Sequence, residues 1–420
     1  MPTLTELAEN ALANAKILDA YVASKGLPPA SFENDSLNEA QLPSHLEVAR
    51  NSLADQCQII KRLALGPVET MIEILYSFTD ILSLQAVVEY KLASHVPLTG
   101  TTTYAELAQA SNIDESLCRR FVTHAMENGV FLEESGTIRH SALSRILGTD
   151  PEAVAAAALV AGELAPASAR VLEAMKTYPN SQKPTETAYS IENKTNLPVY
   201  AFLAQHPARM SRFGMGMQFF SRTGGFDLQH LATAFEWSSL DKPEAVLIDI
   251  GGGLGTVSKF LASATKNMRF VVQDLPGPVE IGQQTLAQEF KGRVEYVAGD
   301  FFEEQKIVGA DVYFLRWILH NWSDDYCVKI LRSVANAMRK NSKLMIYEYV
   351  LAEGPELKWT QKQGRNLDMV MMACWNSCER TASQWKNLIK RVDEKFRFLG
   401  VRKAEGSSMS IIEWDWDGSE

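Results

Sequence analysis

Apolar residues recur at helical spacing through most of the first half of the chain. Residues 1–25 place their apolar side chains on one stripe, and Thr3 with Glu6 has the spacing of a helix capping box. The pattern resumes over residues 45–98, where residues 67–92 are apolar on most faces. We expect that last segment to be buried, either within the protein or between subunits.

A small module is predicted between residues 101 and 150. Two short helices, 104–111 and 115–128, precede a hairpin over residues 130–139, which is the element order of a winged helix. Winged helices often read DNA, but this module carries seven acidic and four basic side chains, whereas a DNA-binding surface should be basic. We therefore expect the module to serve dimerisation.

The period of the pattern changes in the second half of the chain. A polar stretch over residues 178–196 marks the change, so we predict one domain over residues 1–190 and a second over residues 191–420. Short apolar strands that alternate with helices predict a doubly wound parallel sheet. The five strands are 245–250, 269–275, 293–298, 311–317 and 343–350, and two more, 396–403 and 409–414, have no helix between them and should pair antiparallel.

A glycine-rich turn follows the first of these strands. The turn contains Gly251, Gly253 and Gly255 and leads into a helix; glycine lets the backbone turn sharply and approach a ligand closely. A dinucleotide fingerprint would place its third small residue at Thr256, whereas a glycine stands one position earlier. This spacing, with Asp249 just before the turn, favours S-adenosylmethionine, with a nicotinamide cofactor or a purely structural turn as the alternatives.

The next two strands end on residues suited to the same ligand. Asp274 ends the second strand, where its carboxylate can accept hydrogen bonds from both ribose hydroxyls. Asp300 and Phe301 follow the third strand, where a carboxylate and an aromatic ring suit an adenine. Ordinary core packing is the alternative for Phe301.

One histidine stands where the chemistry of such a site requires a base. His320 comes directly after the fourth strand, in the segment WILHNW, and is the only one of the seven histidines in such a position. A phenol titrates near ~10 and an imidazole near ~6.5, so a histidine can take the proton as the phenolic oxygen gains a methyl group. A capping or core histidine is the alternative.

Five segments in order resemble a known family: VLIDIGGGLGTVSKFL, FVVQDLP, VAGDFFE, ADVYFLRWILHNWSDDYCVKIL and CERTASQW. They are similar to the caffeic-acid-type O-methyltransferases of plants and most closely to their fungal secondary-metabolite relatives, over residues 60–400. The resemblance implies a Rossmann-like methyltransferase domain preceded by a mainly helical, winged-helix-like dimerisation domain. It also implies cofactor contacts at Gly251, Asp274, Leu275, Asp300, Phe301 and Arg316, to which the glycine turn adds Gly253.

The resemblance also assigns the catalytic roles. It implies that His320 is the general base and that Glu348 and Glu379 flank and orient it. A carboxylate bonded to Nδ1 of an imidazole sets its tautomer and raises its basicity. The chain departs from the plant pattern at Asn321, where plant members usually have Asp, which leaves the orientation of cofactor or substrate open.

Methionine and aromatic residues near the predicted site suggest a flat, apolar acceptor. Plain core packing is the alternative for each of them, since such residues at helical spacing commonly fill a core. The sequence does not name the acceptor. The residues expected to line its pocket are Met215, Phe219, Trp317, Met369, Met372, Trp375 and Asn376.

Composition narrows the classes of function. A hydrophobic content of 46% and a charged content of 22% are those of a globular protein, and a net charge of −10 argues against a nucleic-acid partner. No apolar run reaches the ~18 residues that a membrane span needs. Five scattered cysteines without a secretion signal or a completing ligand cluster favour a cytoplasmic protein with reduced thiols and no metal.

Three hypotheses remain. The leading one is an S-adenosylmethionine-dependent O-methyltransferase that acts as a homodimer on a hydroxyl, expected to be phenolic, of a hydrophobic metabolite. The second is a pericyclase that uses the bound sulfonium on the same scaffold, and we favour methyl transfer over it because His320, Glu348 and Glu379 are all present. The third is a winged-helix regulator that senses a metabolite, which would need a basic surface that the module lacks.

Overall fold

The computed structural model describes residues 2–39, 42–222 and 224–418 of the chain, which forms two compact units. The first comprises Met1–Arg170, Tyr200–Ser221 and Glu356–Lys362, and the second comprises the remaining segments, Val171–Val199, Arg222–Pro355 and Gln363–Glu420. The units therefore interleave along the sequence, whereas the sequence predicted one boundary near residue 190. The reason is that α14 (Pro207–Ser221) packs against α9 (Pro151–Leu159) in the first unit.

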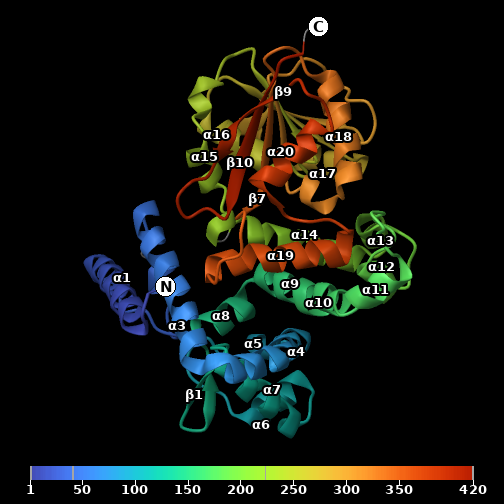
Figure 1. Ribbon diagram of the computed structural model, residues 1–420. Coiled ribbons are helices and arrows are strands. Elements are labelled where there is room, and N and C mark those ends of the chain that lie inside the picture. The colour runs from blue at the N-terminus through green and yellow to red at the C-terminus, as the bar shows by residue number, and fades with distance from the viewer. Residues whose placement is uncertain (1, 40–41, 223, 419–420) are drawn as a thin grey trace. The chain divides into compact units, whose positions relative to one another are not determined.

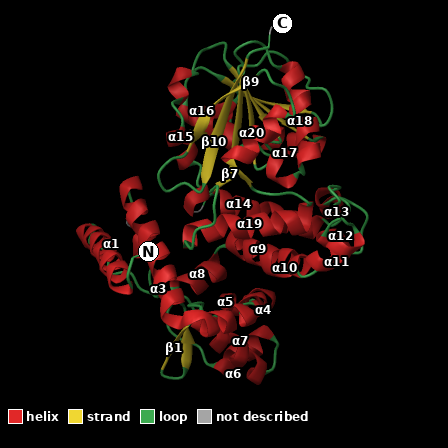
Figure 2. Ribbon diagram, in the orientation of Figure 1, coloured by secondary structure: helices red, strands yellow, loops and turns green. Residues whose placement is uncertain are grey.

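The first unit is mainly helical (Figures 1 and 2). Its first helix begins with the predicted capping box, in which the Glu6 amide donates to Thr3 Oγ1 at 3.2 Å. Two helices and an antiparallel hairpin follow in the predicted order, with Gly136 at the hairpin tip. The elements besides α9 and α14 are α1 (Leu4–Ser24), α2 (Ser36–Glu39), α3 (Ser44–Tyr76), α4 (Phe78–Glu89), α5 (Leu92–His95), α6 (Tyr104–Ser111), α7 (Glu115–Glu127), β1 (Leu132–Glu134), β2 (Thr137–Arg139), α8 (Ala142–Thr149), a π-helical turn at Val160–Leu164, α10 (Ala165–Ser168) and α13 (Val199–Ala204), which begins in the second unit's segment.

The helices α3 and α4 expose an apolar surface. Gly66, with φ +70°, breaks the helical conformation within α3 just before Pro67. Of the described residues, the span His45–Glu89 is long and apolar enough to cross a membrane by length and composition, although only 17% of its most apolar window is buried. The span passes this test on its mean hydropathy and contains no uninterrupted apolar run of about 18 residues, because its charged side chains are scattered among the apolar ones.

The second unit is built on an eight-stranded sheet with the strand order β5-β4-β3-β6-β7-β10-β9 and with β8 beside β7. The five predicted parallel strands and the antiparallel final pair are confirmed. In the register of this sheet, Ile248 lies beside Tyr313 and Ile346 beside Ile412. The strands are β3 (Val246–Ile250), β4 (Arg269–Asp274), β5 (Val294–Ala298), β6 (Val312–Arg316), β7 (Lys343–Leu351), β8 (Arg380–Thr381), β9 (Phe396–Arg402) and β10 (Met409–Trp416).

Two hydrophobic clusters cover the two faces of this sheet. On β3, Ile248 belongs to one cluster and its neighbour Leu247 to the other, because successive strand residues point to opposite faces. Leu331 and Trp385 join the first cluster and Leu261 the second, so helices lie on both faces, as in other parallel sheets. The helices are α11 (Val171–Thr177), α12 (Ala188–Glu192), α15 (Gln229–Ala234), α16 (Thr256–Ala264), α17 (Pro276–Thr285), α18 (Asp324–Ala337), α19 (Trp359–Trp375), which begins in the first unit's segment, and α20 (Ala382–Lys390).

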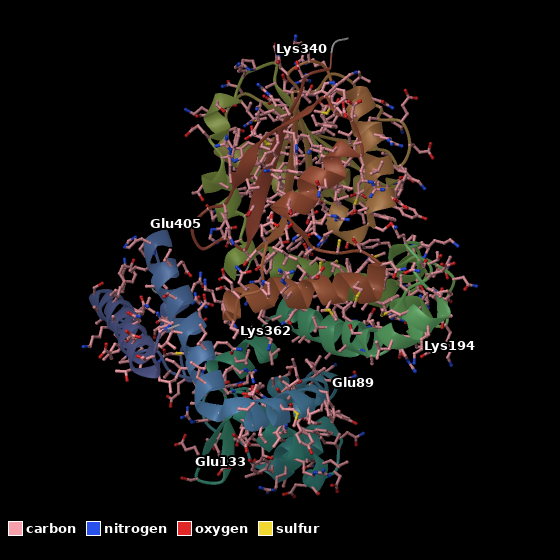
Figure 3. The ribbon with its side chains drawn as sticks, viewed as in Figure 1. Glu89, Glu133, Lys194, Lys340, Lys362 and Glu405 are labelled. Atoms are coloured by element: carbon pink, nitrogen blue, oxygen red, sulfur yellow. The ribbon has the colours of Figure 1, made fainter. Side chains whose placement is uncertain are left out.

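Charged side chains lie outside these clusters. Figure 3 labels six of them, including Lys340 and Glu405 in the second unit and Glu89 in the first, and all six are exposed. The parallel strands leave their carboxyl ends at one edge of the sheet, which is where ligands bind in folds of this class.

Candidate active site

His320 lies in a short 3-10 helix, Leu319–Asn321, directly after β6. Trp317 starts this turn with φ +54°, a left-handed conformation that bulky residues rarely adopt. The Asn321 side-chain amide donates to the Trp317 carbonyl at 2.8 Å and closes the turn. The residue that departs from the plant pattern therefore stabilises the segment that carries the predicted base.

Two glutamates meet the imidazole of His320. Its Nδ1 lies 2.7 Å from Oε1 of Glu379, which immediately precedes β8, and 3.8 Å from Oε2 of Glu348 on β7. Oε1 of Glu348 accepts hydrogen bonds from the amides of Ile318 and Leu319 at 3.0 and 3.1 Å. The structure thus brings together the three residues that the resemblance named.

The geometry indicates how the imidazole is protonated. All three side chains are buried, and the carboxylate of Glu379 is an acceptor, so Nδ1 carries the donated proton. That tautomer leaves the lone pair on Nε2 free to take a proton. An imidazole held in this way can act as a general base.

Charge around the imidazole changes its pKa. Burial lowers the pKa of His320, but Glu348 and Glu379 outweigh burial and raise it above the ordinary imidazole value. Burial and the neighbouring Glu379 together raise the pKa of Glu348 to about 7, although His320 lowers it. The protonation of His320 and that of Glu348 therefore depend on each other.

The same three groups are close enough together to bind a metal ion. A metal on Nδ1 would displace its hydrogen bond to Glu379, which already satisfies that nitrogen at 2.7 Å. We therefore expect the protein to carry no stoichiometric metal, and elemental analysis before and after dialysis against EDTA would test this. A bound ion at one per chain, with loss of folded protein on chelation, would contradict this expectation.

The glycine turn after β3 has a backbone conformation that favours glycine. Gly251, Gly253 and Gly255 all have positive φ, of 69°, 57° and 74°. A Cβ on Gly251 would lie 2.4 Å from Cδ1 of Ile318, so a larger residue would displace the segment that leads to the base. Glycine is therefore needed at these positions, both for the positive φ angles and to leave room for neighbouring side chains.

Asp274 faces this turn from the end of β4. One carboxylate oxygen accepts from the Gly253 amide at 2.7 Å and the other from the Leu275 amide at 2.7 Å. A carboxylate offers about four acceptor positions, so positions remain for two ribose hydroxyls. The donor and acceptor chemistry at the ends of β3 and β4 thus fits S-adenosylmethionine.

Sequence reasoning missed the support beneath the glycine turn. Asp249 is buried, accepts a hydrogen bond from Ser258 Oγ at 2.8 Å and would touch any Cβ placed on Gly252. Burial raises the pKa of Asp249 to about 6. Its place two residues before the first glycine was noted for the fingerprint, but a supporting role could not be recognised without the packing.

The remaining predicted cofactor residues also lie at the carboxyl edge. Asp300 and Phe301 follow β5, where the Phe301 ring packs edge-on against Trp322 with centroids 6.0 Å apart. Leu275 stands at the start of α17 with 53% of its surface exposed. Arg316 ends β6, with its guanidinium 4.2 Å from the Trp317 ring. Their contacts with the cofactor stay predictions.

The predicted acceptor residues fall into two groups. Met215 and Phe219 belong to the first unit, and their role stays a prediction. In the second unit, the Trp317 ring lies nearly parallel to His320, with centroids 6.5 Å apart. The other residues lie on or just after α19, where Met369 is exposed, Trp375 is buried, and Met372 and Asn376 line a cavity of about 330 Å³ whose lining does not include His320.

Asn376 has a contact that the sequence did not suggest. Its side-chain amide donates to the carbonyls of Lys183 and Glu186 at 3.0 and 2.8 Å, and its own φ is +52°. The residue therefore anchors the segment before α12, which forms another wall of the same cavity. Two further residues that sequence reasoning missed are Asp368, which accepts from the Glu379 amide at 2.9 Å, and Arg380, the neighbour of Glu379 in the segment CERT.

The chain is similar to known O-methyltransferases in sequence and to solved structures in fold. Residues 185–393 match the model of an O-methyltransferase domain. A chlorophenol O-methyltransferase from Trichoderma longibrachiatum is 34% identical over 418 residues, which cover 98% of this chain and 90% of the relative. Two solved structures share the fold. OxaC in complex with SAH and oxaline has a TM-score of 0.76 at 17% identity over 98% of both chains, and a pericyclic reaction enzyme has a TM-score of 0.71 at 20% identity over 97% of this chain and 99% of that one.

The cofactor site yields a direct prediction. Changing Asp274 to Ala removes the proposed ribose acceptor and the bond to the Gly253 amide, so affinity for S-adenosylmethionine should weaken by about 2–3 kcal/mol. Calorimetric titration of the folded variant measures the change. Asp241→Ala is the matched control, because Asp241 also accepts backbone amides, those of Lys266, Asn267 and Met268, but at the opposite end of β4. Equal affinity in the Asp274 variant and the wild type would overturn the ribose assignment.

Proposed function

This chain belongs to the O-methyltransferase family and uses S-adenosylmethionine as its methyl donor, and we propose that it methylates a phenolic hydroxyl of a hydrophobic secondary metabolite with His320 as the general base. The observation that carries the proposal is the buried hydrogen bond of 2.7 Å between His320 Nδ1 and Glu379 at the carboxyl edge of the sheet. The bond holds the imidazole in the tautomer whose Nε2 can accept a proton.

The reaction divides between the cofactor and the protein. When bound, S-adenosylmethionine would supply an electrophilic methyl group on its sulfonium, which would leave as the neutral thioether once the acceptor oxygen takes the methyl group. Nε2 of His320 takes the proton that this oxygen loses, and Glu379 stabilises the imidazolium that results. Glu348 adds a second carboxylate and, through the amides of Ile318 and Leu319, keeps the turn before His320 in place.

A phenolic acceptor fits both the residues and the relatives. The Trp317 ring beside His320 offers an apolar, aromatic surface on which a flat ring can pack. One relative of this chain acts on chlorophenol. A phenol has a pKa near ~10, low enough for a neutral imidazole to take its proton as the oxygen is methylated.

The base assignment predicts a specific pattern in the pH dependence. His320→Ala should lower turnover of a phenolic substrate by ~10²–10⁴ while cofactor affinity stays unchanged. The wild-type rate should fall as the pH drops through the raised pKa of His320, since the protonated ring cannot act as a base. The variant should lack this step and regain activity at high pH, where the phenol ionises unaided. The measurement is mass spectrometry of a phenol panel incubated with methyl-labelled cofactor.

A matched control separates chemistry from stability in this experiment. His140 is also buried, with hydrogen bonds to Ser144 and to the Val96 carbonyl in the first unit, so His140→Ala should lose stability without losing the pH step. A His320→Ala enzyme that methylates at the wild-type rate near neutral pH would rule out the base. Converted substrate without label, beside intact cofactor, would favour a pericyclase instead.

We also propose that the protein is a homodimer held through the first unit. The apolar surface of α3 and α4 includes Val68, Met71, Leu75 and Phe78, each at least 55% exposed. Their spacing of three or four residues places them on one helical face. A patch of this kind on a water-soluble chain marks an interaction site.

If the protein is a dimer held through this face, charged substitutions on the face should halve its mass in solution. Leu75→Glu combined with Phe78→Glu should convert a dimer into a monomer at micromolar concentration, measured by sedimentation velocity. Val308→Glu is the control, since Val308 is 73% exposed but lies in the second unit. A wild-type monomer that binds lipid vesicles through this face would instead assign the apolar span to a membrane surface.

A further inference from the structure

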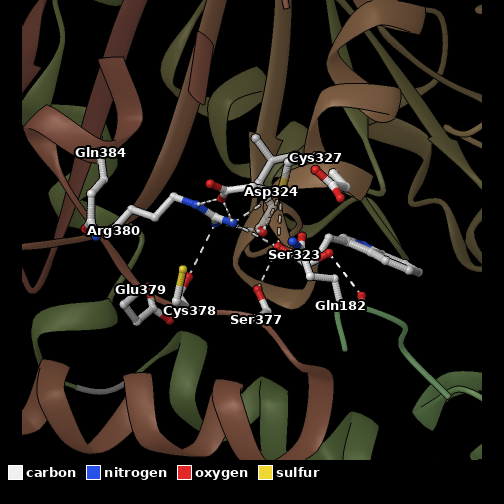
Figure 4. Close-up of polar contacts among 12 residues, drawn as sticks. Gln182, Ser323, Asp324, Cys327, Ser377, Cys378, Glu379, Arg380 and Gln384 are labelled. Atoms are coloured by element: carbon white, nitrogen blue, oxygen red, sulfur yellow. Dashed lines mark hydrogen bonds and ion pairs between the residues drawn. The ribbon is translucent and has the colours of Figure 1, made fainter. Parts of the chain in front are cut away.

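Arg380 is a buried cation next to the catalytic residues. It lies on β8, one position after Glu379, and only 1% of its surface is exposed. Its Nη1 donates to the carbonyls of Leu319 and Cys378 at 3.1 and 3.3 Å. Its Nη2 donates to the carbonyl of Trp322 at 2.9 Å. Nη2 and Nε both donate to Oδ1 of Asp324, at 2.8 and 3.0 Å (Figure 4).

These contacts bracket the hydrogen bond between the base and its partner. Leu319 immediately precedes His320, and Trp322 follows the Asn321 that closes the turn, so the guanidinium binds the backbone on both sides of the base. Cys378 immediately precedes Glu379, so the same group also binds the backbone of the partner carboxylate. One planar side chain therefore connects two segments that are 59 positions apart in the sequence.

We propose that Arg380 is a positioning residue that sets the His320–Glu379 distance by binding the backbone of both segments. The inference rests on the proposed role of His320 as the base. An arginine suits this task because its five N–H groups form a rigid planar fork, whereas a lysine presents three donors from one atom. Here five donor–acceptor contacts to oxygen satisfy the fork, which is what makes a buried cation tolerable.

The charge of Arg380 has a second consequence for His320. Glu348 from β7 and Glu379 face the imidazole and favour its protonated form, while burial opposes that form. Arg380 lowers the pKa of His320 against the two carboxylates. Two further acidic side chains lie next to this group. Asp324 on α18 forms an ion pair with Arg380, and Asp368 on α19 accepts a hydrogen bond from the Glu379 amide. Without the guanidinium, His320 should stay protonated up to a higher pH.

Position and charge can be separated by two substitutions. Arg380→Lys keeps the charge but loses the fork, so turnover should fall by roughly 10²-fold, the usual cost of misplaced reacting groups, with the acid limb of the pH profile unmoved. Arg380→Gln loses both, so turnover should fall and the acid limb should move to higher pH. Cofactor affinity should stay at the wild-type value in both, because the described contacts of Arg380 involve neither the glycine turn nor Asp274.

Arg293 provides a matched control elsewhere in the same unit. Its guanidinium donates to the carbonyls of Ala262, Thr265 and Met268, at the end of the sheet away from the site. Arg293→Gln should therefore lower the melting temperature without moving the pH profile. If the effect of the Arg380 variants were only a loss of stability, the Arg293→Gln variant should show the same change in turnover. If Arg380 positions the base, only the Arg380 variants should show it.

The decisive measurement follows His320 itself. Nitrogen-15 NMR of histidine-labelled full-length protein reports the tautomer and pKa of His320 without any turnover, alongside kcat against pH for each variant. We expect the Nδ1–H signature to weaken in Arg380→Lys and the His320 titration to move upward in Arg380→Gln. Wild-type kcat and an unchanged His320 signal in Arg380→Lys would overturn the proposal, and this variant decides the case if Arg380→Gln does not fold. If His320→Ala retains the wild-type rate, the role of the base fails, while the NMR titrations still test whether Arg380 positions the ring.

Discussion

Two glutamates and one histidine lie together away from water, and the backbone around them is arranged to satisfy these polar groups. A buried carboxylate is costly unless it is hydrogen-bonded. Glu348 meets this need through two backbone amides, and Glu379 meets it through the imidazole. Arg380 on the short β8 adds hydrogen bonds to the turn after β6 and to Asp324 at the start of α18, so the site and its frame form one network.

The parallel sheet brings the predicted cofactor turn and the segment that carries His320 to the same edge. β3 and β6 are neighbours, so the glycine turn that ends one strand and the segment that carries the base after the other leave the sheet side by side. The packing shows the closeness of the two, since a Cβ on Gly251 would meet the side chain of Ile318. A cofactor held by the turn would thus lie beside the base, which is the proximity that methyl transfer requires.

The fold alone does not select the reaction. OxaC and a pericyclic reaction enzyme share it with this chain at 17% and 20% identity, so the argument for methyl transfer depends on the site and on the O-methyltransferase relatives. The site holds His320 in the tautomer that a general base requires, with one carboxylate bonded to it and a second 3.8 Å away. The proposed role of Arg380 would explain why the imidazole keeps its position beside two carboxylates.

The sequence by itself determined the features that depend on local pattern. Short apolar runs between helical stretches predicted the strands, the glycine spacing predicted the cofactor turn, and the place of His320 after β6 predicted the base, because each depends on a few neighbouring residues. Only the tertiary structure showed that Glu379 bonds to that histidine, that Asn376 anchors the segment before α12, and that Arg380 connects the two catalytic segments. These contacts join residues that are tens to hundreds of positions apart, and they depend on which strands lie side by side and on how the helices pack over them. For the same reason the interleaving of the two units, which follows from α14 packing on α9, could not be inferred from a single change of pattern along the chain.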